Sequence, residues 1–166
     1  MLRNLLLISF LCYHGKSLGQ DISKLKQIDS IVTIINQSNF NNTIDSVVSD
    51  DYHITKVMDG IELIKYVMRI LTRQQTNGVF INEWTESTSF YFDHNHLIKV
   101  EEVMVKEDKK NILDWNHSEV NWYYMGDKPL YYSLQLGNSE QRAKFLLTLS
   151  KDLVKTVNGE NHGYTK

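Results

Sequence analysis

Apolar and polar positions alternate most clearly in the middle of the chain, between Val79 and Leu136. Aromatic-rich runs there are separated by short polar segments, at residues 93–96 and again at residues 126–129. A period of two residues is typical of β-strands, and strands joined by short turns are typical of antiparallel neighbours. The pattern therefore predicts an antiparallel β-meander of about five strands.

Strand alternation sorts the aromatic side chains of this meander onto two faces of the predicted sheet. Two consecutive acidic residues, Glu101 and Glu102, interrupt the alternation, and we interpret them as a β-bulge. One set of side chains can face a core: Phe90, Phe92, Trp122, Tyr124, Tyr132 and Leu134. The other set then points away from that core: Tyr91, Tyr123 and Tyr131.

Helical spacing of apolar residues marks both flanks of the meander. Asp21 can cap a helix over residues 22–36. A second, amphipathic helix begins after Asn138, where Gln141 completes a capping box, and it ends at Asn158-Gly159. The apolar stripe of the first helix consists of Leu25, Ile28, Ile31, Val32 and Ile35.

Two segments between the first helix and the meander are harder to interpret. Residues 43–57 are weakly patterned, and a short helix over residues 44–48 is one interpretation. Residues 61–75 fit two patterns. As a helix, they present one polar arc and end at Gly78. As a strand, they present one apolar face and enter a two-residue hairpin turn at Asn77-Gly78.

We favour the strand for residues 61–75 because it makes sensible cross-strand pairs. Direct pairing of the two residues that flank the turn sets Arg69 opposite Glu86 and Leu71 opposite Trp84. Opposite charges and large apolar side chains both stabilise a sheet when they face each other on neighbouring strands.

Together these elements predict an α+β fold: an N-terminal helix, an antiparallel β-meander of about five strands and a C-terminal amphipathic helix packed on one sheet face. We expect a single domain over residues 20–159 and a flexible tail over residues 160–166. The other sheet face has no predicted cover. It could therefore receive a partner, or a second copy of the chain.

Residues 1–19 have the pattern of a cleaved export signal. Arg3 supplies the basic start, an apolar run follows, and Ser17-Leu18-Gly19 is a small-x-small cleavage site. The apolar run is shorter than the roughly 20 residues that a spanning helix needs. We therefore expect an exported, periplasmic or secreted protein with no membrane span after cleavage. Lipid attachment at Cys12 is the alternative, which the bulky Phe10-Leu11 disfavours.

Composition narrows the classes of partner. With 166 residues, 42% of them hydrophobic, the chain can bury a core without metals or disulfides. Its formal net charge of −2 becomes more negative on cleavage, because Arg3 and Lys16 leave with the signal. Nucleic-acid binding needs a basic stripe, so we expect no nucleic-acid partner. Three Asn-x-Ser/Thr triplets are glycosylation acceptors only in a host that glycosylates: Asn36, Asn41 and Asn116.

The turn Asp93-His94-Asn95-His96 is the strongest metal candidate in the sequence, because it brings an acid and two imidazoles close together. A third ligand would come from elsewhere, with His117 and Asp114 as choices. Asp and Asn at a tight turn are also explained by local hydrogen bonds to the backbone. Ile98 stands where a calcium-binding loop requires glycine. We therefore expect no bound metal or cofactor.

Other clusters do not form a catalytic set. Glu83 and Glu86 flank Trp84, which suggests a glycosidase, but residues three apart on a strand point to opposite faces. The segment Asp50-Asp51-Tyr52-His53 lacks a nucleophile. No serine lies in a Gly-x-Ser-x-Gly motif, and the glycines are too scattered for a phosphate-binding loop. We therefore expect no catalytic residues.

The remaining candidate is the sheet face that carries Tyr91, Tyr123 and Tyr131, with Lys99 nearby. Tyrosine is enriched at interfaces, although cross-strand tyrosines also simply stabilise sheets. Our first hypothesis is a non-catalytic, exported binding module that presents an open sheet face to a protein or glycan. The alternatives are a small metal-dependent hydrolase that uses residues 93–117, and an inhibitor or immunity protein for a toxic enzyme.

Overall fold

The chain forms two compact units, Met1–Gln37 and Ser38–Lys166. The predicted export signal over residues 1–19 lies outside the described residues, so export stays a prediction. The single domain expected over residues 20–159 also stays a prediction. No helix in the described ranges is long and apolar enough to cross a membrane. The computed structural model describes residues 22–38, 42–76, 79–108, 116–133 and 138–163.

A helix over residues 22–37 is the regular element of the first unit. Its most buried side chains are Ile28, Val32 and Ile35, which all belong to the predicted apolar stripe. Their spacing of four and three residues places them on one helix face. The predicted N-terminal helix is therefore confirmed.

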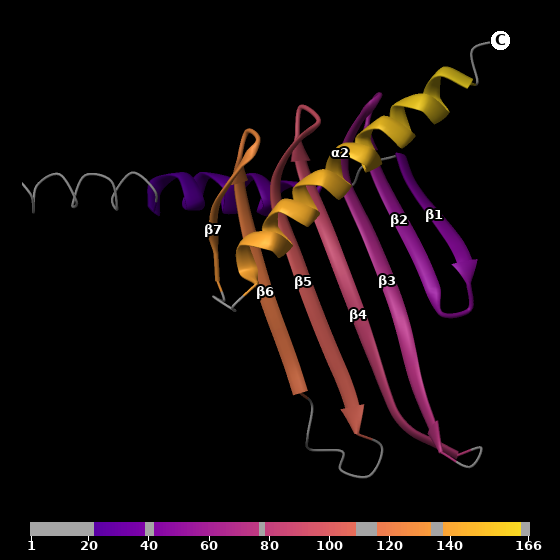
Figure 1. The fold of residues 1–166 in the computed structure, drawn as a ribbon. Coiled ribbons are helices and arrows are strands. Elements are labelled where there is room, and N and C mark those ends of the chain that lie inside the picture. Colours follow the sequence, from indigo (N-terminus) through magenta and orange to yellow (C-terminus); the bar gives the residue numbers. More distant parts are fainter. Residues whose placement is uncertain (1–21, 39–41, 77–78, 109–115, 134–137, 164–166) are drawn as a thin grey trace, which may run out of the picture. The chain divides into compact units, whose positions relative to one another are not determined.

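The second unit consists of a seven-stranded antiparallel sheet and a long helix, α2 (Ser139–Gly163) (Figure 1). The strands lie across the sheet in chain order, so each pairs with its neighbours in the sequence. They are β1 (Asn42–Ser49), β2 (Tyr52–Asp59), β3 (Glu62–Thr76), β4 (Val79–Asp93), β5 (His96–Asp108), β6 (Asn116–Met125) and β7 (Lys128–Tyr132).

The α+β class and the antiparallel meander are confirmed, but the prediction of about five strands was wrong. The region of residues 43–57 forms β1 and β2, and no short helix over residues 44–48. Both strands are rich in β-branched residues, which favour extended backbone. The sequence pattern is weak in β1 because an edge strand buries little of either face. The favoured strand over residues 61–75 is confirmed as β3.

The register between β3 and β4 differs from the prediction by one residue. Thr76 does pair with Val79, but a bulge between Gln74 and Gln75 shifts every pair beyond it. Arg69 therefore lies opposite Ser87 and Leu71 opposite Thr85, where Glu86 and Trp84 had been predicted. A bulge adds one residue to one strand, which turns each later side chain relative to its expected partner.

The predicted bulge at Glu101-Glu102 was also wrong. Both residues lie in regular pairing with β4 and β6, and the shift between β4 and β5 falls between Tyr91 and Phe92. The two glutamates point to opposite faces, and each is held there by hydrogen bonds from neighbouring side chains. Those hydrogen bonds explain how two acidic residues can occupy strand positions where the alternating pattern predicts an apolar residue.

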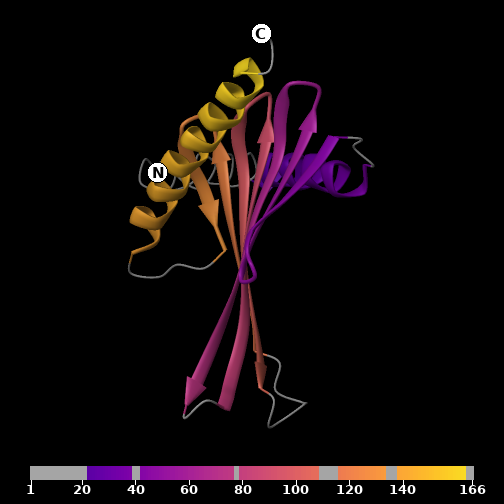
Figure 2. The same ribbon diagram turned by 90° about the vertical axis from the view of Figure 1, so that its right-hand side faces the viewer.

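The helix α2 lies against one face of the sheet, and its apolar side chains complete the core (Figure 2). The backbone N–H of Arg142 donates to the carbonyl oxygen of Asn138 over 3.0 Å, which fixes the start of the helix. The helix continues past the predicted stop at Asn158-Gly159 and ends at Gly163. Gly159 is not in a left-handed conformation. It therefore costs helix stability, about 1 kcal/mol, without terminating the helix.

Strand alternation sorted the aromatic residues correctly. Phe90, Phe92, Trp122 and Tyr124 are buried in the core with α2, and Tyr132 packs against them. Leu134, the sixth predicted member, lies outside the described residues. On this face one row of paired residues crosses all seven strands: Ile44, Lys56, Tyr66, Phe90, Val100, Trp122 and Tyr132.

Candidate functional site

The face of the sheet that packs on α2 continues beyond the N-terminal end of that helix, along β4, β5 and β6 (Figure 1). Where the helix begins, the surface forms a hollow of about 290 Å³. We name this site the sheet hollow. Its lining consists of Glu86, Ser87, Thr88, Glu102, Val103, Met104, Ser118, Val120 and Arg142.

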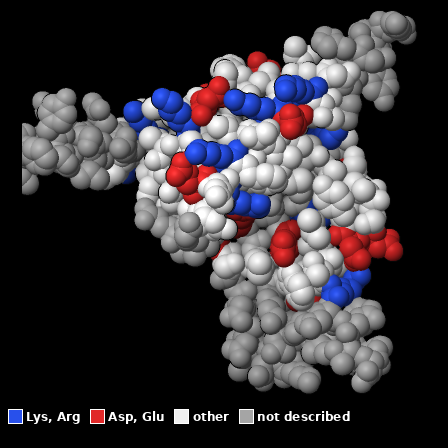
Figure 3. All heavy atoms as spheres, viewed as in Figure 1, with Lys and Arg blue, Asp and Glu red and all other residues white. Residues whose placement is uncertain are grey.

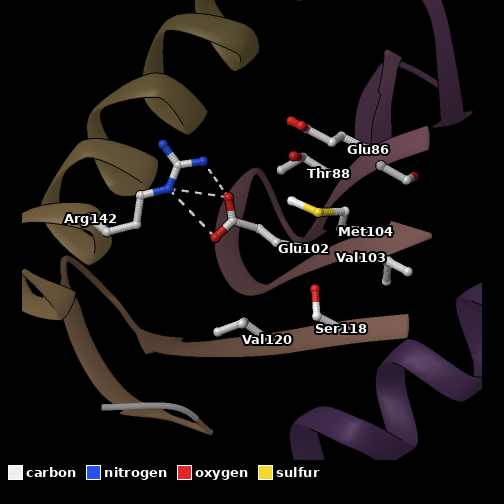
Figure 4. Close-up of a pocket in the computed structure, with 9 residues that line it drawn as sticks. Glu86, Thr88, Glu102, Val103, Met104, Ser118, Val120 and Arg142 are labelled. Atoms are coloured by element: carbon white, nitrogen blue, oxygen red, sulfur yellow. Dashed lines mark hydrogen bonds and ion pairs between the residues drawn. The ribbon is translucent and has the colours of Figure 1, made fainter. Parts of the chain in front are cut away.

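One end of the sheet hollow is closed by an ion pair between the helix and the sheet (Figure 4). The Nε atom of Arg142 donates to a carboxylate oxygen of Glu102 over 3.1 Å, and its Nη2 atom donates to the same oxygen. Glu102 also accepts a hydrogen bond of 2.7 Å from the indole Nε1 of Trp122, which is a buried core residue. Glu102 thus ties the start of α2 to the core.

The rest of the lining combines apolar groups with oxygen atoms. Met104 is 43% exposed, and Val120 lies beside it on the next strand. Figure 4 shows the Glu86, Thr88 and Ser118 side chains around the same space. Register explains this grouping, because Glu86 faces Met104 on β5 and Met104 faces Ser118 on β6. An apolar floor with a few oriented oxygen groups is the usual composition of a small-ligand site.

The four residues predicted for partner binding share the other sheet face. Tyr91, Lys99, Tyr123 and Tyr131 pair directly across β4, β5, β6 and β7, and Lys65 on β3 extends the row. The ammonium groups of the two lysines lie 5.0 Å from the ring centroids of Tyr91 and Tyr123. Such cation–π contacts stabilise neighbouring strands.

Exposure within this tyrosine row is uneven. Tyr91 is 1% exposed, Lys99 7% and Tyr123 8%, whereas Tyr131 is 46% exposed. Glu101 accepts hydrogen bonds from the Tyr91 hydroxyl and the Lys99 ammonium over 2.8 and 2.9 Å. These contacts lie within the sheet and account for the residue types by stability alone. Partner binding at this face stays a prediction.

The predicted metal candidate forms a tight turn. His94 and Asn95 both have positive φ angles, as a two-residue hairpin turn between β4 and β5 requires. The Asn95 side-chain oxygen accepts a bond of 3.3 Å from the Leu63 backbone N–H, and the His94 ring lies 3.3 Å from a Glu62 carboxylate oxygen. Among the described residues, no three His, Cys, Asp or Glu side chains form a metal-binding group.

Changing Asn95 to alanine is expected to lower the free energy of unfolding by about 1–2 kcal/mol. Alanine is strained at a φ of 62° and removes the acceptor for Leu63. Asn95→Gly relieves the strain but still lacks the acceptor, so it should cost less than alanine. Urea unfolding measures both changes. Equal losses for the two variants would show that strain at this turn is unimportant.

The other sequence candidates are held in separate local contacts. Glu83 forms an ion pair with Arg73, which also binds Asp51 on the turn between β1 and β2. Glu86 instead accepts a 3.0 Å bond from the Trp84 indole. Glu83 and Glu86 therefore do not converge. The Asp114 backbone and the His117 side chain lie outside the described residues.

The link between Glu102 and Arg142 was missed by sequence reasoning, because forty residues separate the two in the chain. The only signal was the interrupted alternation at Glu101-Glu102. Charges of both signs are present on the molecular surface in Figure 3, with lysine and arginine side chains gathered mainly over α2. Comparison of the chain with protein-family models, curated proteins and solved structures gave no match.

Proposed function

We propose that the protein is a non-catalytic binding module and that its sheet hollow receives one sugar unit of a glycan. The observation that carries this proposal is the combined lining of the hollow, with apolar Met104 and Val120 beside the oxygen atoms of Glu86, Thr88 and Ser118. A sugar ring presents apolar C–H groups on its faces and hydroxyl groups around its rim. Carboxylates accept hydrogen bonds from such hydroxyls, and serine and threonine both donate and accept.

Size supports the same ligand class. Sites for small molecules usually enclose roughly 300–1,000 Å³. The sheet hollow, at about 290 Å³, is just below this range, which suits a ligand as small as one sugar unit. Trp84 stands next to Glu86 on this face, since its indole N–H donates to that carboxylate. Its ring can extend the apolar surface toward a second sugar unit.

The state of the carboxylates supports binding rather than hydrolysis. Glycosidases need two converging carboxyl groups that are available to act as acid and nucleophile or base. Glu102 lines the sheet hollow, but Arg142 and Trp122 already occupy its oxygen atoms with hydrogen bonds. These hydrogen bonds hold the Glu102 carboxylate in a fixed position between the helix and the core.

A matched pair of methionine variants tests the proposed site. Met104→Lys places a charge and a longer side chain in the sheet hollow, and we expect at least about a tenfold loss of glycan affinity. Met125→Lys is the control. Met125 is 52% exposed, similar to the 43% of Met104, but it is the last residue of β6, whereas the sheet hollow is lined by Ser118 and Val120 in the first half of that strand. A glycan array followed by calorimetry on the best glycan gives both affinities. Equal affinity in the two variants, or no glycan bound at all, would contradict the proposal.

We also propose that the protein acts after export, on the basis of Arg3, the apolar run and the Ser17-Leu18-Gly19 site. The mature chain should then begin at Gln20. The intact mass of protein isolated from the host envelope or medium measures this directly. A mass that still includes residues 1–19 would show that no cleavage occurs there.

A further inference from the structure

The two edge strands of the sheet differ in how they are protected against pairing with another strand. β7 is five residues long and contains Lys128 and Pro129, and both residue types block strand addition. β1 is eight residues long and contains no proline, lysine or arginine. A strand edge without such features offers a row of backbone groups to an incoming strand.

The side chains of β1 are also unusually apolar for an exposed edge. Ile44, Val47 and Val48 are 51%, 69% and 58% exposed. Asp45 is the one charged residue in this strand, and its carboxylate accepts a 2.7 Å hydrogen bond from Thr55 on β2. Its charge is therefore held toward its own hairpin. β1 thus combines a backbone edge without proline or basic residues with apolar side chains that remain in water.

We propose that β1 pairs antiparallel with β1 of a second copy of this chain, around a two-fold axis at Ser46. The sequence on either side of Ser46 makes this strand complementary to itself, because Ile44 and Val48 lie two residues away in each direction. Pairing Ser46 with its own copy sets Ile44 across from Val48 and Asp45 across from Val47. A register centred one residue earlier would set Asp45 against Asp45, which like-charge repulsion disfavours.

β1 also contains a bulge near its C-terminal end. The register with β2 passes from Val47 to Ser49, so Val48 has no directly paired residue on β2. Val48 is 58% exposed, and Ile44 of the second copy would add an apolar neighbour to its side chain. The two sheets then form one continuous sheet, in which the β1 edges of both copies are paired with each other across the two-fold axis.

Disulfide trapping tests the register. With Cys12 changed to serine, a Ser46→Cys chain contains a single thiol. Paired residues on antiparallel strands have Cα atoms roughly 4.5–5.5 Å apart, which suits a disulfide. Thr43→Cys on the same strand is the control. In the proposed register its two copies lie about 20 Å apart at roughly 3.3 Å per residue. We expect oxidation to link most Ser46→Cys chains into dimers and to leave Thr43→Cys chains unlinked.

Light scattering tests the association itself, using the wild-type protein and Val47→Lys. The exposed position of Val47 lets lysine be accommodated in the monomer, and a charged edge blocks strand pairing. We expect a wild-type dimer and a Val47→Lys monomer with an unchanged circular dichroism spectrum. A wild-type monomer even at about 1 mM, a Val47→Lys dimer, or equal cross-linking of both cysteine variants would overturn the proposal.

Discussion

Replacing Leu146 with alanine is expected to lower the free energy of unfolding by about 2–5 kcal/mol. Leu146 is fully buried on the face of α2 that packs on the sheet, in one cluster with Phe90, Trp122 and Tyr124. The change removes buried apolar surface and leaves a cavity that the surrounding aromatic rings can fill only in part. Urea unfolding followed by tryptophan fluorescence measures the loss.

Phe145→Ala is the control for Leu146→Ala. Phe145 is the larger side chain and the direct neighbour of Leu146, but it is 53% exposed. Its ring centroid lies 5.2 Å from the Arg142 guanidinium, which is also on the surface of α2. Its loss should cost less than about 1 kcal/mol. Equal destabilisation of both variants would contradict the assignment of Leu146 to the buried face of α2 and of Phe145 to the exposed face.

Glu102→Ala is expected to cost about 1–3 kcal/mol of folding free energy. The variant removes the acceptor of the Trp122 indole N–H, which is buried in the core, and it also releases Arg142 at the start of α2. A buried donor without a partner costs its full desolvation energy. Most of the loss should therefore disappear when Glu102→Ala is made in a Trp122→Phe background, which a double-mutant cycle measures.

The matched control for Glu102→Ala is Glu86→Ala. Glu86 also accepts a hydrogen bond from an indole, that of Trp84, but this bond is exposed to solvent. Water can replace the lost acceptor there, so the expected cost is within about 0.5 kcal/mol. Similar losses at Glu86 and Glu102 would show that burial of the Trp122 indole does not determine the cost.

The fold was predictable where the sequence pattern reflects burial on one side. The aromatic residues of β4 and β6 alternate between core and opposite face, so Phe90 and Trp122 were assigned to the core correctly. β1 was missed because an edge strand leaves Val47 and Val48 exposed, and no alternation results. The bulge between β3 and β4 was missed because its extra residue, Ile81, lies in the continuous apolar run Val79-Phe80-Ile81, which has no alternation that an added residue would disturb.

The candidate site was much less predictable than the fold. Its lining comes from three strands and the first turn of α2. Which sheet residues line the hollow depends on where along the strands α2 begins to cover the sheet. No local motif encodes that position. Tyr91 and Tyr123 attracted attention as interface residues, yet their contacts with Lys65, Lys99 and Glu101 are those of a cross-strand ladder.

Native mass spectrometry of the protein, isolated gently from its own host, tests the central claim that the sheet hollow holds a glycan. We predict a bound species with the mass of a saccharide on the wild type and on Met125→Lys, and its loss on Met104→Lys. Protein that carries no added mass in any of the three forms, or a saccharide retained equally by Met104→Lys, would contradict the assignment of the sheet hollow as the binding site.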